Sequence, residues 1–154
     1  MKPVLLAEDE PSDVFIMERA WKKAGIENEL RIVKDGQQAV EYIGGTGAFT
    51  DREKHPLPCL ILLDIKLPYL SGHQVIEWVR ATHSAQTLPV VFLTSSANDM
   101  DIDKAYRLGG NAYLVKPPTA EKLVQMLEDL KNFWMKHNCF PPDALAIKHP
   151  AQVG

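Results

Sequence analysis

The chain has 154 residues, of which 45% are hydrophobic and 24% are charged. That length suits one hydrophobic core, because a single core commonly serves about 100–150 residues. The net charge of −3 gives no general attraction to nucleic acid or anionic lipid, and no local Lys/Arg cluster supplies one. No apolar run approaches the roughly 20 residues that cross a bilayer, and the chain does not start with a secretory leader pattern. We therefore expect a cytoplasmic protein that binds neither nucleic acid nor membrane.

Short apolar runs alternate with helical patterns from one end of the chain to the other. Pro11 suits the first turn of a helix and Gly25 its end. Asp35 and Ser71 each begin the pattern of a capping box, which marks a helix start. The predicted strands are 4–7, 29–34, 59–63, 88–94 and 112–116. The predicted helices begin at residues 11, 35, 71, 105 and 119, and the last of them can run to residue 137.

The strict alternation of strands and helices predicts an α/β fold. Its sheet is parallel, with right-handed crossovers and helices on both faces. For a doubly wound sheet of five strands the usual order is the flavodoxin-like 2-1-3-4-5, with a ligand crevice where the ends of strands one and three diverge. We assign residues 1–131 to this domain and residues 132–154 to a C-terminal helix extension and arm.

Polar side chains stand where successive predicted strands end. They are Glu8 and Asp9 after the first strand, Asp64 after the third, Thr94 ending the fourth and Lys116 ending the fifth. A set of oxygen ligands suits Mg²⁺, so Asp9 and Asp64 are expected to bind it directly, with Glu8 nearby or acting through water. Asp64 is also a competent nucleophile for a phosphoryl group, whose oxygens Lys116 and Thr94 would stabilise.

Each of these residues taken alone is more often a solvated surface residue, but their agreement around one crevice favours a site. Two other functions are disfavoured by specific residues. A flavin or nucleotide binder would need little negative charge in the first loop, where residues 8–10 are all acidic. A phosphatase with an aspartyl intermediate would need an acid two residues after its nucleophile, where this chain has Lys66.

The motifs at residues 5–10, 63–68, 71–72, 93–95 and 116–117 resemble those of the response-regulator receivers of two-component signalling. The resemblance extends from residue 3 to about residue 131. It implies a phosphoacceptor at Asp64, a metal site of Glu8, Asp9, Asp64 and the Lys66 backbone carbonyl, phosphoryl contacts from Thr94, Ser95 and Lys116, a switch pair of Thr94 and Tyr113, and a cis peptide bond before Pro117.

The same resemblance implies a partner, a sensor histidine kinase that donates the phosphoryl group. The chain would catalyse only its own phosphotransfer and dephosphorylation. The long connection at 46–58 and the Phe133-Trp134 pair are similar to the small regulators paired with bacterial phytochromes, so a phytochrome-type kinase is expected. Residues 132–154 are too few for a DNA-binding output domain, which leaves protein contacts as the output. The complete site argues against a receiver fold kept purely as a binding module.

The Lys66 side chain has three possible arrangements. It can pair with Glu8, pair with the phosphoryl group, or point into solvent, and the sequence does not choose among them.

The C-terminal segment predicts a homodimer. A helix from residue 119 to residue 137 reaches roughly 28 Å at 1.5 Å per residue, farther than a short strand covers. Its distal end carries Phe133 and Trp134 and leads to Phe140, after which two prolines end any helix. A symmetric exchange of the following arms would cover both exposed ends. The alternative is a monomer with a disordered tail.

Overall fold

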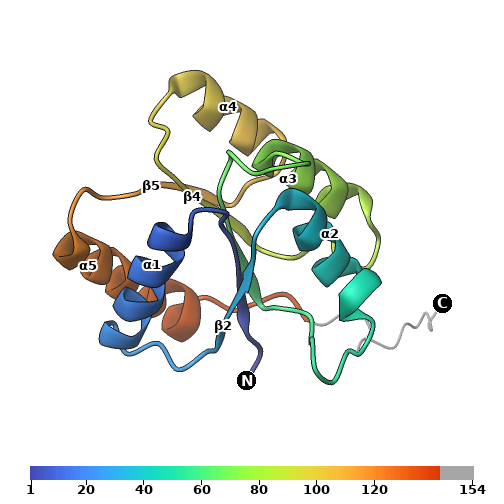
Figure 1. The fold of residues 1–154 in the computed structure, drawn as a ribbon, viewed down its shortest axis with the longest axis horizontal. Helices are drawn as coiled ribbons and strands as arrows, with labels where there is room; N and C mark the ends of the chain where they lie inside the picture. Colours follow the sequence, from blue (N-terminus) through green and yellow to red (C-terminus); the bar gives the residue numbers. More distant parts are fainter. Residues whose placement is uncertain (143–154) are drawn as a thin grey trace.

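The structure, a computed structural model, describes residues 1–142, which form one parallel sheet between two layers of helices (Figure 1). Within these residues the strands are β1 (Val4–Ala7), β2 (Leu30–Val33), β3 (Leu60–Leu63), β4 (Val90–Thr94) and β5 (Ala112–Val115). Their order is β2-β1-β3-β4-β5, and every pair is parallel. The predicted fold class and strand order are therefore confirmed.

Alternation along β1 divides the core in two. Leu5 and Ala7 face the layer formed by α2 (Gly36–Gly44), α3 (Gly72–Ala81) and α4 (Asp99–Arg107). Val4 and Leu6 face the opposite layer, formed by α1 (Pro11–Lys23) and α5 (Ala120–Leu130). Because both faces are covered, every residue of β1, β3 and β4 is buried, and all are apolar except Thr94 at the end of β4, as expected for a parallel sheet.

The predicted helix starts agree with the structure except at α4. Pro11 is the first residue of α1, the Asp35 side chain caps α2, and Ser71 and Gln74 form the capping box of α3. The fourth helix was predicted to begin at residue 105, but it begins at Asp99. Apolar periodicity misses its first turns because Ala105 is the one residue of α4 that is buried.

The chain stays helical to His137, as predicted, because α5 continues into η2 (Lys131–His137), a π-helix. Trp134 and Phe140 then pack against the α1–α5 side of the core, with their rings stacked 6.4 Å apart. The proposed arm, residues 143–154, lies outside the described residues. Within residues 1–142, no helix has both the length and the apolar character needed to span a membrane.

Candidate functional site

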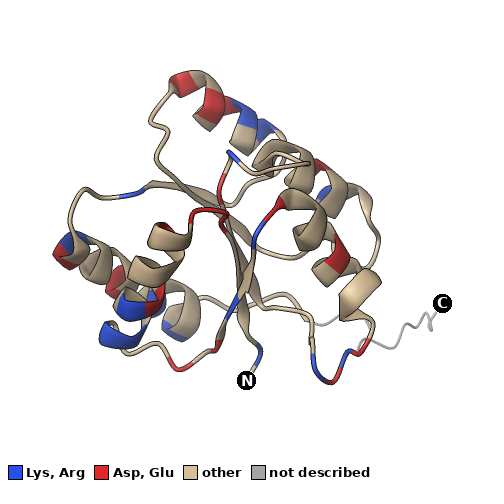
Figure 2. Cartoon of the chain, viewed as in Figure 1, with Lys and Arg blue, Asp and Glu red and all other residues tan. Residues whose placement is uncertain are grey.

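The predicted site residues meet at the carboxyl edge of the sheet. The acidic loop between β1 and α1 runs over this edge, where Figure 2 shows it as a red segment. Asp64 directly follows β3 in the centre of the sheet and is buried, with 7% of its surface exposed. Thr94, the last residue of β4, is also buried. The parallel register of β3 and β4 brings the two side chains together.

Both carboxylate oxygens of Asp64 are hydrogen-bonded. The Thr94 hydroxyl donates to Oδ1 at 2.8 Å, and the Lys66 backbone N–H donates to the same oxygen at 3.3 Å. The Lys116 ammonium donates to Oδ2 at 3.0 Å. The Asp64 carboxylate is thus oriented from both sides.

Lys116 is the electrostatic centre of the site, because its Nζ contacts three carboxylates. It donates to Glu8 Oε1 in a short hydrogen bond, to Asp64 Oδ2 and, at 3.3 Å, to Asp13 Oδ2. Burial disfavours the ammonium, but the hydrogen bonds to Glu8 and Asp64 outweigh burial and raise the pKa of Lys116. The residue therefore stays a cation at every physiological pH.

Asp13 is the site residue that sequence reasoning missed. It lies in the first turn of α1, and its contact with Lys116 depends on how α1 packs beside the end of β5. No sequence spacing reports that contact. The weak signal available was a further acid five residues after Glu8. The Asp13 side chain is 43% exposed, so it is the most weakly held of the three partners of Lys116.

The expected metal ligands are only partly assembled. Glu8 uses Oε1 for Lys116 and accepts a hydrogen bond from the Glu10 backbone N–H on Oε2, so it serves here as a counter-ion of Lys116. Asp9 is exposed and makes no hydrogen bond or ion pair within residues 1–142. In the same part of the chain no three His, Cys, Asp or Glu side chains form a metal-binding group. The Lys116 ammonium lies between Glu8 and Asp64 and offsets part of their negative charge.

The Lys66 side chain is exposed and forms no ion pair with the described residues. The structure therefore lacks the pair with Glu8, and a pair with the phosphoryl group stays a prediction.

The expected switch residues lie on one side of the site. The Tyr113 hydroxyl donates to the Ser96 carbonyl oxygen at 2.9 Å, and its ring stacks on Phe92 with centroids 5.8 Å apart. Tyr113 is therefore turned inward and tied to the loop that follows Thr94. Ser95, expected beside the phosphoryl group, is exposed, and its role stays a prediction.

One expectation is wrong in the structure. No peptide bond within residues 1–142 is cis, so the bond between Lys116 and Pro117 is trans. The trans form is the lower in energy for most X–Pro bonds. Lys116 reaches its three carboxylates from this conformation, and its backbone N–H still donates to the Thr94 carbonyl at 2.8 Å.

Comparison with known proteins gives a consistent picture. Residues 4–128 match the family described as the response regulator receiver domain. Response regulator Rcp1 of Synechocystis sp. is 33% identical over 140 residues, covering 91% of this chain and 93% of that protein. The Mn²⁺-bound crystal structure of Rcp1 superposes with a TM-score of 0.81 and covers 92% of this chain and 99% of its own.

Two further solved structures are similar over almost the same span. The response regulator RPA3017, from red light signaling of R. palustris, is 37% identical with a TM-score of 0.87, covering 92% of this chain and 99% of that one. The phosphorylated cyanobacterial phytochrome response regulator RcpA is 29% identical with a TM-score of 0.83, covering 91% and 98%. These similarities concern the whole fold rather than a single motif.

Proposed function

The chain belongs to the response regulator receiver family, and on this premise we propose that it accepts a phosphoryl group on Asp64 from a sensor histidine kinase. The observation that carries the proposal is the arrangement around Asp64, a buried carboxylate held by Thr94 on one oxygen and Lys116 on the other. Receiver domains catalyse only their own phosphotransfer. We assign residues 1–131 to the receiver and residues 132–154 to an extension.

The transfer needs little from the protein beyond position and charge. An Asp64 oxygen attacks the phosphorus of a phosphohistidine and forms an O–P bond, while the P–N bond breaks and its electron pair returns to the imidazole nitrogen. Lys116 and the Thr94 hydroxyl are placed to stabilise the phosphoryl oxygens as charge develops on them. Asp64 needs no general base because a carboxylate oxygen is itself the nucleophile.

We assign the metal to Mg²⁺, held by Asp9, Asp64 and the Lys66 backbone carbonyl. The donor chemistry fits, because Mg²⁺ takes one or two carboxylates and retains several waters. Asp9 has no competing partner among the described residues. Bound there, the ion would neutralise negative charge shared between the acids and the phosphoryl group.

Phosphoryl incorporation is therefore expected to require divalent metal. Wild-type chain treated with a small phosphodonor should be labelled in millimolar Mg²⁺ and not in excess chelator, because the carboxylates would then repel the incoming anion. Intact mass spectrometry measures the labelled fraction. Equal labelling in chelator would contradict the metal assignment.

The output of the site is proposed to pass through Thr94 and Tyr113. A phosphoryl oxygen on Asp64 offers the Thr94 hydroxyl a stronger acceptor than the carboxylate does. The loop after Thr94 carries Ser96, to which the Tyr113 hydroxyl is bound. A change at Thr94 would thereby be transmitted to Tyr113 and to the surface of α4, β5 and α5.

A stable phosphoryl mimic, beryllofluoride with Mg²⁺, is expected to shift the ring resonances of Tyr113 in NMR spectra of the wild type. The same addition to Thr94→Ala should leave them in place, because the link between Asp64 and the loop is missing. Tyr42, buried on α2, lies outside that surface and is an internal control. Tyr113 shifts that do not change in the wild type would count against the switch.

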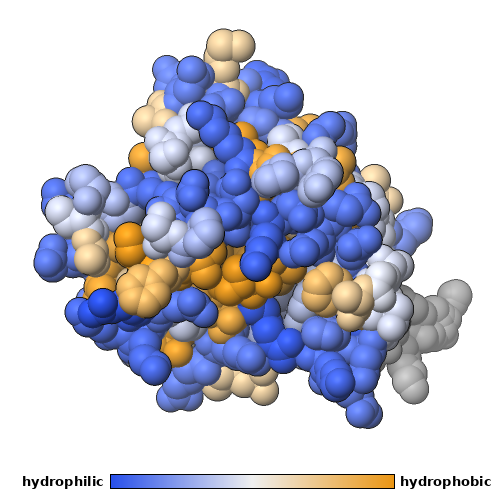
Figure 3. Space-filling model, viewed as in Figure 1, coloured by the Kyte–Doolittle hydropathy of each residue, from blue (hydrophilic) through white to orange (hydrophobic). Residues whose placement is uncertain are grey.

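A second surface is suited to binding a protein phosphodonor. Figure 3 shows apolar residues gathered over α1 and β2. Phe15 and Ile16 of α1 are exposed and line a groove of about 420 Å³ between α1 and α5. Exposed apolar patches of this kind mark protein contacts. Relatives that act with phytochromes support a phytochrome-type kinase as the partner.

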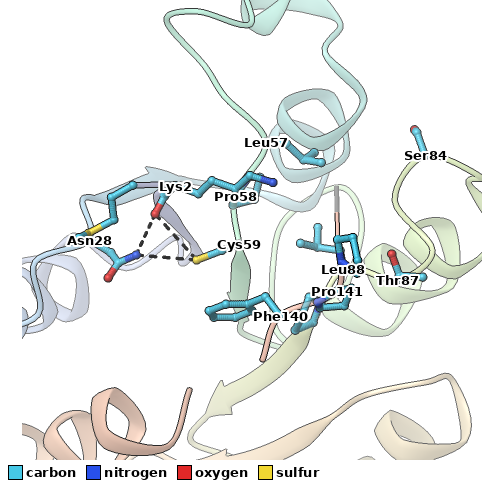
Figure 4. A pocket seen from close by; sticks show the side chains of 13 residues that line it. Lys2, Asn28, Leu57, Pro58, Cys59, Ser84, Thr87, Leu88, Phe140 and Pro141 are labelled. Carbon is cyan, nitrogen blue, oxygen red and sulfur yellow. Dashed lines mark hydrogen bonds between the residues drawn. The ribbon is translucent and has the colours of Figure 1, made fainter. Parts of the chain in front are cut away.

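We also propose a homodimer. Phe133 is 56% exposed and lines a groove of about 550 Å³ between α5 and the edge strand β5. Trp134 and Phe140, also expected at the interface, are partly buried against the chain's own core, and Trp134 lines the same groove as Phe133. Phe140 lines a cavity of about 380 Å³ at the opposite edge of the sheet from Asp64, beside Cys59 and Leu88 (Figure 4).

The contribution of the arm can be separated from that of Phe133. A chain ending at Pro142 keeps the Trp134 and Phe140 contacts and is expected to dimerise at least about tenfold more weakly than the full chain, because the apolar residues of the arm are lost. The dimer of full-length Phe133→Ser should also be weaker than the wild-type dimer, independently of the arm. Analytical ultracentrifugation of the truncated and substituted chains separates the two contributions to dimerisation. A full-length monomer at high micromolar concentration would contradict the dimer, and equal affinity after truncation would remove the arm from it.

A further inference from the structure

The loop between β3 and α3 contains a strained turn. Within residues 1–142, Tyr69 is the one residue other than glycine with a positive φ, 67°. The Leu70 N–H donates to the Pro68 carbonyl at 2.8 Å, which closes a three-residue γ-turn around Tyr69. The γ-turn with positive φ is rare and disfavoured for residues that carry a Cβ. Glycine would adopt this conformation without strain.

The surrounding structure holds this turn in place. The proline ring fixes φ at Pro68, and the Pro68 carbonyl also accepts a hydrogen bond from the Gly36 N–H at 3.1 Å. A Cβ at Gly36 would lie 1.9 Å from the Leu70 carbonyl oxygen, so the start of α2 rests directly on the loop backbone. Leu67 and Leu70, on either side, pack against the core. The loop therefore cannot relax without disturbing its neighbours.

The Tyr69 side chain gains nothing from the fold in return. It is 84% exposed, and within the described residues it makes no hydrogen bond, ion pair or ring contact. Strain that no internal contact offsets is characteristic of functional positions. An exposed tyrosine on a fixed backbone is well suited to binding another protein, because it offers a large contact area and has only two side-chain torsions to order.

The turn also lies on the rim of the phosphorylation site. The loop begins at Asp64, whose Oδ1 accepts a hydrogen bond from the Lys66 N–H. It closes where the Gly72 N–H donates to the Ile65 carbonyl at 2.8 Å. Figure 1 shows this connection in green above the edge of the sheet, beside the start of α3. A protein that brings a phosphohistidine to the buried Asp64 has to approach past this rim, whereas a small donor does not.

We propose that Tyr69 is a specificity-determining contact for the protein phosphodonor, the histidine kinase. This inference rests on the proposed function and adds a residue to it. Tyr69 takes no part in the chemistry at Asp64. It contributes to docking of the kinase domain that carries the phosphohistidine, and the strained turn fixes the backbone position from which its ring projects.

The test compares a protein donor with a small one. Acetyl phosphate is used to phosphorylate each of four proteins: wild type, Tyr69→Gly, Tyr69→Phe and Tyr106→Ala. They are also treated with an autophosphorylated histidine kinase. The kinase used is the one, among those of the same organism, that labels wild type fastest. Tyr106→Ala is the matched control, since that tyrosine is exposed near the far end of α4.

For Tyr69→Gly we expect the rate from the kinase to fall about tenfold, as for a hot-spot residue, and the rate from acetyl phosphate to stay within about twofold. Its denaturation midpoint should equal or exceed that of wild type, because glycine relieves the turn. Tyr69→Phe should retain most kinase transfer, and Tyr106→Ala all of it.

Other outcomes distinguish failure of the docking role of Tyr69 from failure of the proposed function. If Tyr69→Gly accepts phosphoryl from the kinase at the wild-type rate, or loses both donors equally, the docking role is wrong while phosphorylation of Asp64 stands. A wild type that accepts from acetyl phosphate but from no kinase of its organism also overturns the docking role. A wild type that accepts from neither donor overturns the proposed function itself.

Discussion

Asp64→Asn is expected to lower phosphoryl incorporation by at least about 100-fold, whether the donor is a kinase or a small molecule. The amide that replaces the carboxylate has the same size and can still accept the Thr94 hydroxyl, so the fold should be retained. What it lacks is a nucleophilic oxygen with a full negative charge. The labelled fraction after a fixed time in Mg²⁺ measures the effect.

Asp13→Asn is the matched control for that experiment. Asp13 also contacts the Lys116 ammonium, but it lies on α1 and is not placed as the nucleophile. Its variant should be labelled at a rate near that of wild type. Substantial labelling of Asp64→Asn would show that the phosphoacceptor is elsewhere. Equal loss of labelling in the two variants would show that the effect is purely electrostatic.

Lys116→Ala is expected to fold but to lose the response to phosphorylation. Without the ammonium, Glu8 and Asp64, whose side chains are only 4% and 10% exposed, face each other uncompensated. Leaving such carboxylates unpaired should lower the free energy of unfolding by about 2 kcal/mol in chelator. Mg²⁺ should restore more stability to this variant than to wild type, because the metal can replace the missing positive charge.

The functional part of this prediction is read from Tyr113. Beryllofluoride should shift the Tyr113 resonances in wild type and in Lys122→Ala, a control that removes an exposed lysine of α5. It should leave them unshifted in Lys116→Ala, because the phosphoryl oxygens no longer have a cation linking them to the end of β5. A Lys116→Ala protein with wild-type stability in chelator and a full Tyr113 response would contradict the assigned role.

The sequence predicted what depends on local pattern. Helix caps at Asp35 and Ser71 were identified from residue spacing, and the strand ends placed Asp64, Thr94 and Lys116 at one edge because parallel strands share their direction. The features that were missed depend on packing between distant segments. The contact of Asp13 with Lys116 joins residues 103 positions apart. The inward position of Phe140 depends on a core surface near Trp134 that no single segment reveals.

Backbone conformation was the other feature that the sequence did not predict correctly. The motif at residues 116–117 implied a cis bond through family resemblance, and the structure has a trans bond. The positive φ of Tyr69 was not expected either, since tyrosine is among the residues least suited to that region. Both depend on how neighbouring loops constrain the chain rather than on the residues themselves.

Mass spectrometry of the phosphorylated chain, cleaved into peptides after chemical trapping of the acyl phosphate, tests the central claim most directly. The proposed function predicts one phosphoryl group, on the peptide that contains Asp64 and at that residue alone. It also predicts the same location whether the donor is acetyl phosphate or a histidine kinase. A phosphoryl group on any other residue, or no phosphorylation by either donor in the presence of Mg²⁺, would contradict it.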